Sequence, residues 1–300
     1  MKEANVVMSL MFFTMAFAFY FVTAVFYVGY WVFRKGWMSQ TATAMTYIAL
    51  LATTGMLISR AAEAGHAPFS NLYESMVLFV WAMTIGYIWL ERKHRIKEMG
   101  AFVMTIAFFA MVAASMLPYR FKSVEPLNPA LQNKWKWLVN LLSQAGLEKY
   151  AIGWLDFHVF TTFVGYAAFA ISFGIAIMYV IKERYEAVKK TNVLVDRFPG
   201  SEMLDELGYR TIAWGFPFLT IGIISGAVWA NYAWGTYWSW DPKETWSLIT
   251  WLIYAAYLHA RVTRGWRGRK AAYLSILGFL AVIFLYWGVS FILPGLHAYA

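Results

Sequence analysis

The stretch 153-GWLDFHVFTTFVGYAAFAISFGIAIMYVI-181 decides the fold. Its one Asp, Glu, Lys or Arg residue is Asp156, close to the start, and the rest is almost entirely apolar. The hydrocarbon core of a bilayer is about 30 Å thick, and a helix needs about 20 apolar residues to cross it. This stretch therefore predicts a helix that spans a membrane.

The composition of the whole chain agrees with a membrane protein. Of its 300 residues, 61% are hydrophobic and 14% are charged, whereas a soluble domain carries about 25% charged residues. Aromatic residues make up 20%, more than an aliphatic bundle needs. The chain has no cysteine, which excludes disulfides, iron–sulfur ligation and a thiol relay through this chain.

Long apolar runs recur along the chain, and we predict an all-α, polytopic membrane helical bundle. We expect about eight transmembrane helices in a single domain that covers residues 1–300. The first run is longer than the core of a signal peptide and no small-residue cleavage site follows it, so it is kept as a span. The predicted spans are residues 6–33, 41–60, 70–90, 99–117, 153–181, 210–230, 244–262 and 271–291.

The basic residues are distributed unevenly between alternate connections. One set holds 16 of the 25 Lys and Arg residues: segments 34–40, 91–98, 182–209 and 261–270. The other set holds seven: the N-terminus, segments 61–69, 118–152 and 231–243, and the C-terminal tail. The positive-inside rule places the basic set in the cytoplasm and both termini outside. The net charge of +9 thus reports topology, and no nucleic-acid partner is expected.

The outer loop 118–152 contains a second candidate helix. In 131-LQNKWKWLVNLLSQAGL-147 the apolar residues recur at helical spacing, with Lys134 and Lys136 among tryptophans. This pattern predicts either a helix that lies at the membrane interface or a lid over an outer site.

A second outer loop, about residues 231–246, is rich in tryptophan. Its segment 234-WGTYWSWDPKETW-246 gathers flat amphipathic rings around Asp241. Tryptophan offers stacking area together with an N–H donor. An ordinary aromatic belt at the interface is the alternative, but a belt scatters its rings over many helices. We therefore favour a platform for a flat ligand.

Several histidines fall on the same outer side as this platform. His158 lies near the outer end of the span 153–181, and His297 lies just beyond the last span. Each alone suits an interfacial anchor, but together they suit a porphyrin iron, which accepts one imidazole on each face. His66, in an outer loop, either lines the same pocket or shapes that loop. His94 lies among charges in an inner loop, where solvation is the simplest interpretation.

His259 belongs to the span 244–262, near the cytoplasmic end. An ionisable side chain inside a span is costly unless it is paired, which makes it a functional candidate. At 1.5 Å per residue, the helix path from Asp241 to His259 is roughly 27 Å. His259 is thus a candidate for a second site across the membrane, and the alternative is a histidine that reaches the inner interface beside Arg261.

These residues carry a family resemblance. The run W234-G235-x-x-W238-x-W240-D241 resembles the tryptophan-rich (WWD) signature of haem-handling proteins in cytochrome c maturation. The extension PKETWSLITW resembles the CcsA (ResC) family, the membrane subunit of the system II cytochrome c synthetase. The resemblance runs from about residue 55 onward and includes 65-GHAPFSNLYES-75 and 293-LPGLHAY-299.

The resemblance implies roles for individual residues toward haem b. His158 and His297 match the two axial ligands of a haem held outside, and His259 matches a ligand of a haem held inside the membrane. The cradle of the porphyrin would consist of Trp234, Gly235, Trp238, Trp240 and Asp241.

The function that the resemblance implies is transport of haem across the membrane and its presentation for thioether attachment to the CxxCH motif of apocytochrome c. The chain would be one subunit of a cytochrome c synthetase (haem lyase). A CcsB (ResB) type partner would supply the second ligand of the inner haem. The expected location is the bacterial inner (plasma) membrane or a thylakoid membrane, with the haem site facing the periplasm or outside.

Three alternatives remain at this point. One is a haem-presenting subunit of an ABC-type haem exporter, against which the eight spans and the PKE extension speak. The others are a transporter of another aromatic or anionic substrate, and a structural subunit without haem of its own.

Overall fold

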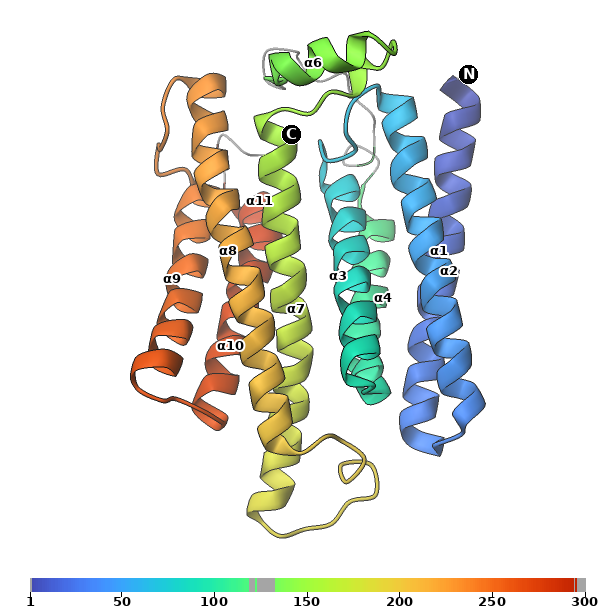
Figure 1. The fold of residues 1–300 in the computed structure, drawn as a ribbon, viewed down its shortest axis with the longest axis vertical. Coiled ribbons are helices and arrows are strands. Elements are labelled where there is room, and N and C mark those ends of the chain that lie inside the picture. Colours follow the sequence, from blue (N-terminus) through green and yellow to red (C-terminus); the bar gives the residue numbers. More distant parts are fainter. Residues whose placement is uncertain (1, 119–121, 123–132, 294, 296–300) are drawn as a thin grey trace.

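The computed structural model describes residues 2–118, 122, 133–293 and 295. Long helices joined by short loops run alongside one another in a bundle (Figure 1). The α-helices are α1 (Lys2–Phe33), α2 (Gly36–Ala64), α3 (Leu72–His94), α4 (Gly100–Met116), α6 (Lys136–Ser143), α7 (Trp154–Ala187), α8 (Ser201–Trp234), α9 (Pro242–Thr263), α10 (Arg269–Ile283) and α11 (Val289–Ile292). A π-helical turn, η4 (Phe284–Gly288), joins α10 to α11, and short 3-10 turns occupy Lys97–Met99 and Glu148–Tyr150.

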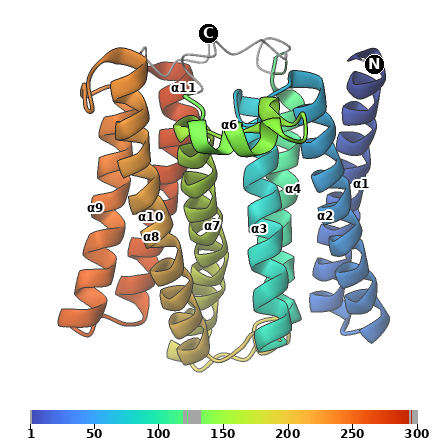
Figure 2. The ribbon, with the colours of Figure 1, turned by 45° about the horizontal axis from the view of Figure 1, so that its top comes forward.

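The predicted all-α polytopic bundle is confirmed. Within the described residues, seven helices are long and apolar enough to cross a membrane, and they coincide with seven of the eight predicted spans. The remaining span, 244–262, forms the 22-residue helix α9 but is not among those seven. Its polar and aromatic residues make it less apolar than the others. In Figures 1 and 2, α9 is the helix at one edge of the bundle, beside α8 and α10.

The helices form two groups that meet at α7. Helices α1 to α4 pack on one another, and α7 to α10 do the same. Contacts of α7 with α3 and α4 join the groups, and buried apolar side chains form a continuous core across them. The second group carries the outer aromatic turn, so the packing of α7 and α8 decides the geometry there.

Helices α7 and α8 approach each other through small residues. A Cβ atom on Gly165 of α7 would lie 3.0 Å from the backbone nitrogen of Leu219. A Cβ atom on Gly215 of α8 would lie 2.6 Å from the Cβ of Ala168. Glycine at such positions lets membrane helices pack backbone to backbone. The two helices therefore form a rigid pair along much of their length.

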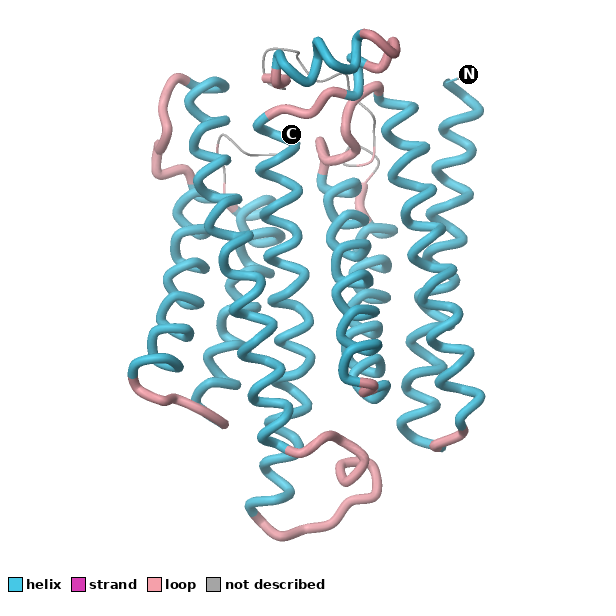
Figure 3. The backbone as a smooth tube through the Cα atoms, viewed as in Figure 1, coloured by secondary structure: helices cyan, strands magenta, loops and turns pink. Residues whose placement is uncertain are grey.

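The connections divide between the two ends of the bundle, as Figure 3 shows. The turn 235–241, the loop 65–71, α6 and the start of α1 lie at one end, called the outer end here after the predicted orientation. The four connections within the basic segments lie at the opposite, inner end. The alternation that the charge pattern predicted is therefore present in the fold.

Two local features differ from the sequence-based picture or extend it. The predicted span 210–230 lies within a longer helix, because α8 runs without a break from Ser201 to Trp234. The predicted helix within 131–147 forms α6, which is only eight residues long. It is tied to the start of α7, because the Trp135 N–H donates to the carbonyl of Ile152 at 3.1 Å. Trp137 and Leu141 are exposed on it.

Candidate functional site

A cavity of about 340 Å³ lies at the outer end, between α7, α8, the start of α9 and the π-helical turn. Pockets for small molecules and cofactors span about 300–1,000 Å³ and are mostly apolar with a few polar groups. The walls fit that description. The lining residues are Phe69, Ser70, Leu155, His158, Val159, Thr162, Phe163, Tyr166, Leu219, Ile223, Gly226, Ala227, Trp229, Ala230, Trp234, Tyr237, Trp238, Lys243, Glu244, Ser247, Leu285 and Tyr286.

His158 is the histidine that lines this cavity among those described. Its Nδ1 lies 2.6 Å from the carbonyl oxygen of Gly222 on α8. A carbonyl only accepts, so Nδ1 carries the proton and Nε2 carries the lone pair. An imidazole whose Nδ1–H is held by a carbonyl is oriented for ligation through Nε2. His158 therefore has the tautomer that an iron ligand needs.

Aromatic rings form much of the cavity wall. Trp234 and Trp229 of α8 pack edge to face, with ring centroids 4.9 Å apart. Phe163 of α7 and Tyr286 of the π-helical turn pack the same way at 5.4 Å. Trp238 also lines the cavity. Two residues of the predicted platform, Trp234 and Trp238, thus reach the cavity together with His158.

The other platform residues shape the turn and do not line the cavity. Gly235 ends α8 in the left-handed conformation, φ 77°, which favours glycine. Asp241 is buried and caps α9, because its Oδ1 accepts the N–H of Lys243 at 3.0 Å. Trp240 is 67% exposed and meets only the edge of Trp238, at 5.8 Å between centroids, among the ring contacts of the described residues.

Lys243 and Glu244 supply polar groups that the sequence-based list did not include. Glu244 Oε2 accepts the backbone N–H of Ser239 at 2.7 Å and its hydroxyl at 3.1 Å. Glu244 Oε1 is buried and has no hydrogen-bond partner within the described part of the chain. Lys243 precedes the predicted span 244–262, and burial lowers the pKa of its amine to about 7, partly offset by the charge of Asp241. In the sequence, Lys243 and Glu244 stand out as two charged residues after Pro242 inside an aromatic turn.

The loop between α2 and α3 closes one side of the cavity with Phe69 and Ser70. Glu74 of α3 holds this loop, since its Oε2 accepts the Ser70 N–H at 3.0 Å and the Ser70 hydroxyl at 2.9 Å. Asn71 caps α3, because its Oδ1 accepts the Glu74 N–H at 2.8 Å. One carboxylate thus links the cavity wall to the start of α3.

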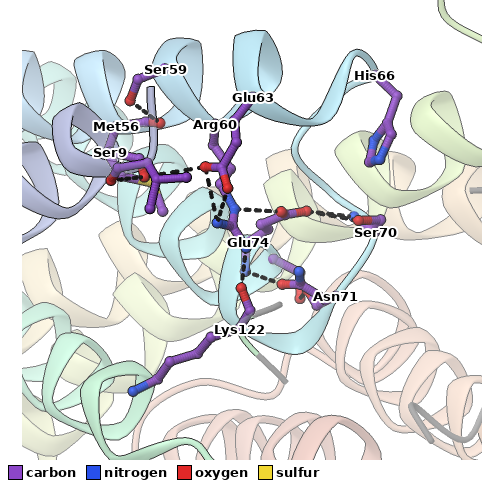
Figure 4. A network of polar contacts seen from close by, with 12 residues as sticks. Ser9, Met56, Ser59, Arg60, Glu63, His66, Ser70, Asn71, Glu74 and Lys122 are labelled. Carbon is purple, nitrogen blue, oxygen red and sulfur yellow. Dashed lines mark hydrogen bonds and ion pairs between the residues drawn. The ribbon is translucent and has the colours of Figure 1, made fainter. Parts of the chain in front are cut away.

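Glu74 is also half of a buried ion pair, drawn in Figure 4. Arg60 Nε of α2 donates to Glu74 Oε1 at 2.8 Å, and both side chains are almost fully buried. The Arg60 guanidinium also contacts Glu63 at 3.2 Å and donates to the carbonyl of Lys122 in the long outer loop. Removing one partner of such a buried pair costs about 3–5 kcal/mol. The network therefore fixes the loop that faces the cavity.

His66 lies on the same loop but does not line the cavity. It is only 5% exposed, and its Nδ1 lies 2.8 Å from the carbonyl oxygen of Ala67. Its Nε2 has no hydrogen-bond partner among the described residues. In Figure 4 its ring stands apart from the Arg60–Glu74 pair. His66 is thus packed within the loop, and the structure does not bring it to the cavity wall with His158.

Of the two remaining candidate ligands, the structure describes only His259, which does not line the cavity. His259 lies near the inner end of α9, and its side chain is exposed on the surface of the helix. His297, the predicted second outer ligand, lies outside the described residues. The structure therefore brings His158 together with Trp234 and Trp238, and it places His259 away from them.

Comparison with known proteins identifies the family and the fold of the chain. Residues 147–297 match the family described as "Cytochrome C assembly protein". This match covers the second helix group together with the aromatic turn. In a comparison of folds, the chain superposes on "Cytochrome c Heme Lyase CcmF" with a TM-score of 0.63 at 19% sequence identity, over 94% of this chain and 47% of that one. The chain spans about half of that protein, and at this identity the likeness concerns the fold.

Curated relatives are closer in sequence. The chain is 41% identical over 293 residues to the "Cytochrome c biogenesis protein CcsA" of Guillardia theta, covering 92% of this chain and 86% of that protein. It is 41% identical over 292 residues to the protein of the same name from Prochlorococcus marinus (strain NATL2A), covering 94% and 92%. The protein from Synechocystis sp. is 37% identical over 325 residues, covering 90% and 92%. The chain is a multi-pass membrane protein of cytochrome c maturation and belongs to the CcsA family.

Proposed function

We propose that the outer cavity binds haem b and presents it for covalent attachment to apocytochrome c. The observation that carries this proposal is the position of His158, whose ring faces an aromatic cavity while its Nδ1 is held by Gly222. Haem is the substrate here, and it supplies the vinyl groups to which the two thiols of a CxxCH motif add. The protein's part is to bind the disc, orient it and leave one edge accessible.

The residues present fit such a substrate. The Trp234 and Trp238 rings offer stacking area for a porphyrin face. Lys243 is a cationic side chain in the cavity wall that suits a carboxylate of the substrate. Tyr237, which is 60% exposed, marks the rim where a polypeptide client can approach. The second iron ligand is His297, as the family resemblance implies. Positioning of this kind accounts for much of the rate in reactions between two bound partners.

The proposed orientation follows the charge pattern. The basic connections face the cytoplasm, and the cavity faces the periplasm or the equivalent outer compartment, with both termini on that side. The membrane is the bacterial inner membrane or a thylakoid membrane. The whole chain acts as one haem-handling membrane domain.

His259 belongs to a second, inner haem site shared with another subunit. Its imidazole is exposed, and α9, which carries it, lies at the edge of the bundle (Figure 2). A partner can reach it there. A buried or lipid-facing imidazole without a partner is costly, and a ligand from a CcsB (ResB) type subunit would complete this site. Haem would pass from there to the outer cavity, and the two subunits together would form the synthetase.

The first test replaces the outer ligand. His158→Ala, purified with the partner subunit, should lose the outer haem's share of the low-spin absorption spectrum, keep any haem at the inner site, and yield little holocytochrome. Added imidazole should restore part of the lost spectrum and of the holocytochrome yield, because it fills the vacant position. His94→Ala is the matched control, since His94 lies at the inner end of α3. Unchanged haem content and spectrum in His158→Ala would contradict the proposal.

A second outcome of the same test separates the rival interpretations. Wild-type protein that carries no haem, even with the partner present, would indicate a different substrate for the cavity. A spectrum that changes equally in His94→Ala and His158→Ala would indicate a general loss of folding. The proposal requires the change in His158→Ala alone.

A further inference from the structure

Two glycines of α8 lie against the His158 imidazole. They are the small residues of the run 222-GIISG-226, one helical turn apart on the face toward α7. The carbonyl of Gly222 accepts the Nδ1–H of His158 at 2.6 Å. A Cβ atom on Gly226 would lie 2.6 Å from both Cε1 and Nδ1 of the same ring. Carbon atoms in contact normally lie about 3.5–4.0 Å apart, so the ring occupies the space of a missing side chain.

The contact at Gly226 is specific to the ring. The three atoms nearest to its Cβ position all belong to the His158 side chain, the third being Cγ at 3.3 Å. Gly208, earlier on the same helix, is different, because a Cβ there would meet Ile175 at 3.7 Å and Ser172 at 3.8 Å, which is ordinary contact. Helix α8 therefore tolerates a methyl group at residue 208 but not at residue 226 without moving the imidazole.

Gly222 contacts the same ring through its backbone carbonyl. A Cβ atom on Gly222 would lie 2.4 Å from Thr162 Oγ1 and 3.1 Å from the Thr162 backbone. Its absence lets α8 come close enough to α7 for the Gly222 carbonyl to reach Nδ1. The carbonyl fixes the tautomer and the direction of the ring, and the gap at Gly226 fixes its position.

We propose that Gly222 and Gly226 are positioning residues that seat the His158 imidazole so that Nε2 faces the cavity. The inference rests on the proposed role of His158 as an iron ligand. Groups that orient a metal-binding histidine in this way typically contribute about 10–100-fold to metal affinity. Gly226 is the better target for a test, because its substitution disturbs the ring and leaves the close packing of Gly222 against Thr162 in place.

The expected effect of Gly226→Ala is a displaced ring. The added methyl group overlaps Cε1 and Nδ1, so the imidazole must move and the hydrogen bond to Gly222 is lost. Haem at the outer site should dissociate about 10–100-fold faster, and the low-spin spectrum should weaken. Added imidazole should restore the spectrum, as in His158→Ala. Gly208→Ala should leave the spectrum, the dissociation rate and the melting temperature unchanged.

The decisive experiment uses the double variant His158→Ala/Gly226→Ala, purified with the partner subunit. Alanine at residue 158 removes the ring that the new methyl group would strike, so the double variant should match His158→Ala in haem retention and melting temperature. It should also recover folding if Gly226→Ala alone folds poorly. Effects that act through one group are not additive, which double-variant cycles detect.

The outcomes distinguish this inference from the function on which it rests. Gly226→Ala with a normal spectrum, or additive losses in the double variant, would overturn the seating role and leave His158 as a ligand. A normal spectrum in His158→Ala itself would overturn the proposed function. The inference is supported if Gly226→Ala and His158→Ala both lose outer haem, the double variant loses no more than His158→Ala, and Gly208→Ala loses none.

Discussion

Neighbouring residues of the aromatic turn divide between two tasks. Asp241 caps α9, and Gly235 ends α8. Trp238 and Lys243, each within a few positions of them, line the cavity. A substitution in this turn therefore acts either on the shape of the turn or on the bound substrate, depending on which side chain changes. The signature residues are not equivalent, although they are adjacent in sequence.

Lys243 should make haem binding depend on pH. Burial lowers the pKa of its amine to about 7, and a substrate carboxylate beside it would raise that pKa, so binding takes up a proton above pH 7. Affinity should then fall by up to about tenfold per pH unit as the pH rises from about 7 to about 9. Haem titrations of the wild type, Lys243→Arg and Lys243→Met measure this.

The two variants serve as controls for other titrating groups such as His158, Asp241 and Glu244. Arginine stays charged over this range, so Lys243→Arg should bind with a flatter profile. Lys243→Met should bind more weakly and also with a flatter profile. If the haem affinity of Lys243→Met falls with pH as steeply as that of the wild type, Lys243 does not bind the carboxylate.

At the level of elements, the two tryptophans of the turn 235–241 differ in position: Trp238 lines the cavity and Trp240 does not. Trp238→Ala removes a ring from the cavity wall and should weaken haem retention by roughly 1–3 kcal/mol. Trp240→Ala removes a ring that is 67% exposed and should have a smaller effect. The measurement is the rate of haem loss to a soluble acceptor. Equal losses in both variants, or none in either, would show that the turn does not bind haem through its cavity face.

The elements themselves were largely predictable, because each apolar run spans a membrane thickness and ends at polar residues. The cap of α3 is equally local, since Asn71 accepts the N–H of Glu74, only three positions later. The start of α8 was missed, because the span 210–230 was predicted from its apolar residues and the preceding segment 201–209 is polar. The π-helical turn 284–288 gave no recognised signal.

The composition of the cavity was harder to predict than the helices. The contact between His158 and Gly222 joins residues 64 positions apart, and it depends on how α7 and α8 pack. Sequence spacing placed His158 and the aromatic turn at one end of the bundle, but it did not separate lining residues such as Trp238 from capping residues such as Asp241. Lys243, Glu244 and Tyr286 were missed for the same reason.

At the scale of the whole molecule, α9 links the two proposed sites. It begins at the outer cavity with Lys243 and Glu244, and it carries His259 near its other end. The helix path between Asp241 and His259 is roughly 27 Å, close to the thickness of a bilayer core. One helix thus connects the outer cavity to an exposed imidazole on the inner half of the bundle.

This arrangement predicts an order of events. If haem enters at the inner site, His259→Ala should deplete haem from the outer cavity although His158 is intact. His158→Ala should instead leave haem at the inner site. Both variants should be purified with the partner subunit, and haem content and spectra compared. Normal loading of the outer site in His259→Ala would mean that haem arrives by another route.

The central claim is that the outer cavity holds haem on His158. The most direct measurement is a cryo-electron microscopy structure of the haem-loaded chain with its partner subunit. We expect a flat density between α7 and the aromatic turn, with iron bound to Nε2 of His158 and the ring system against Trp234 and Trp238. Haem density elsewhere at the outer end, with His158 facing a cavity without haem, would contradict this proposal.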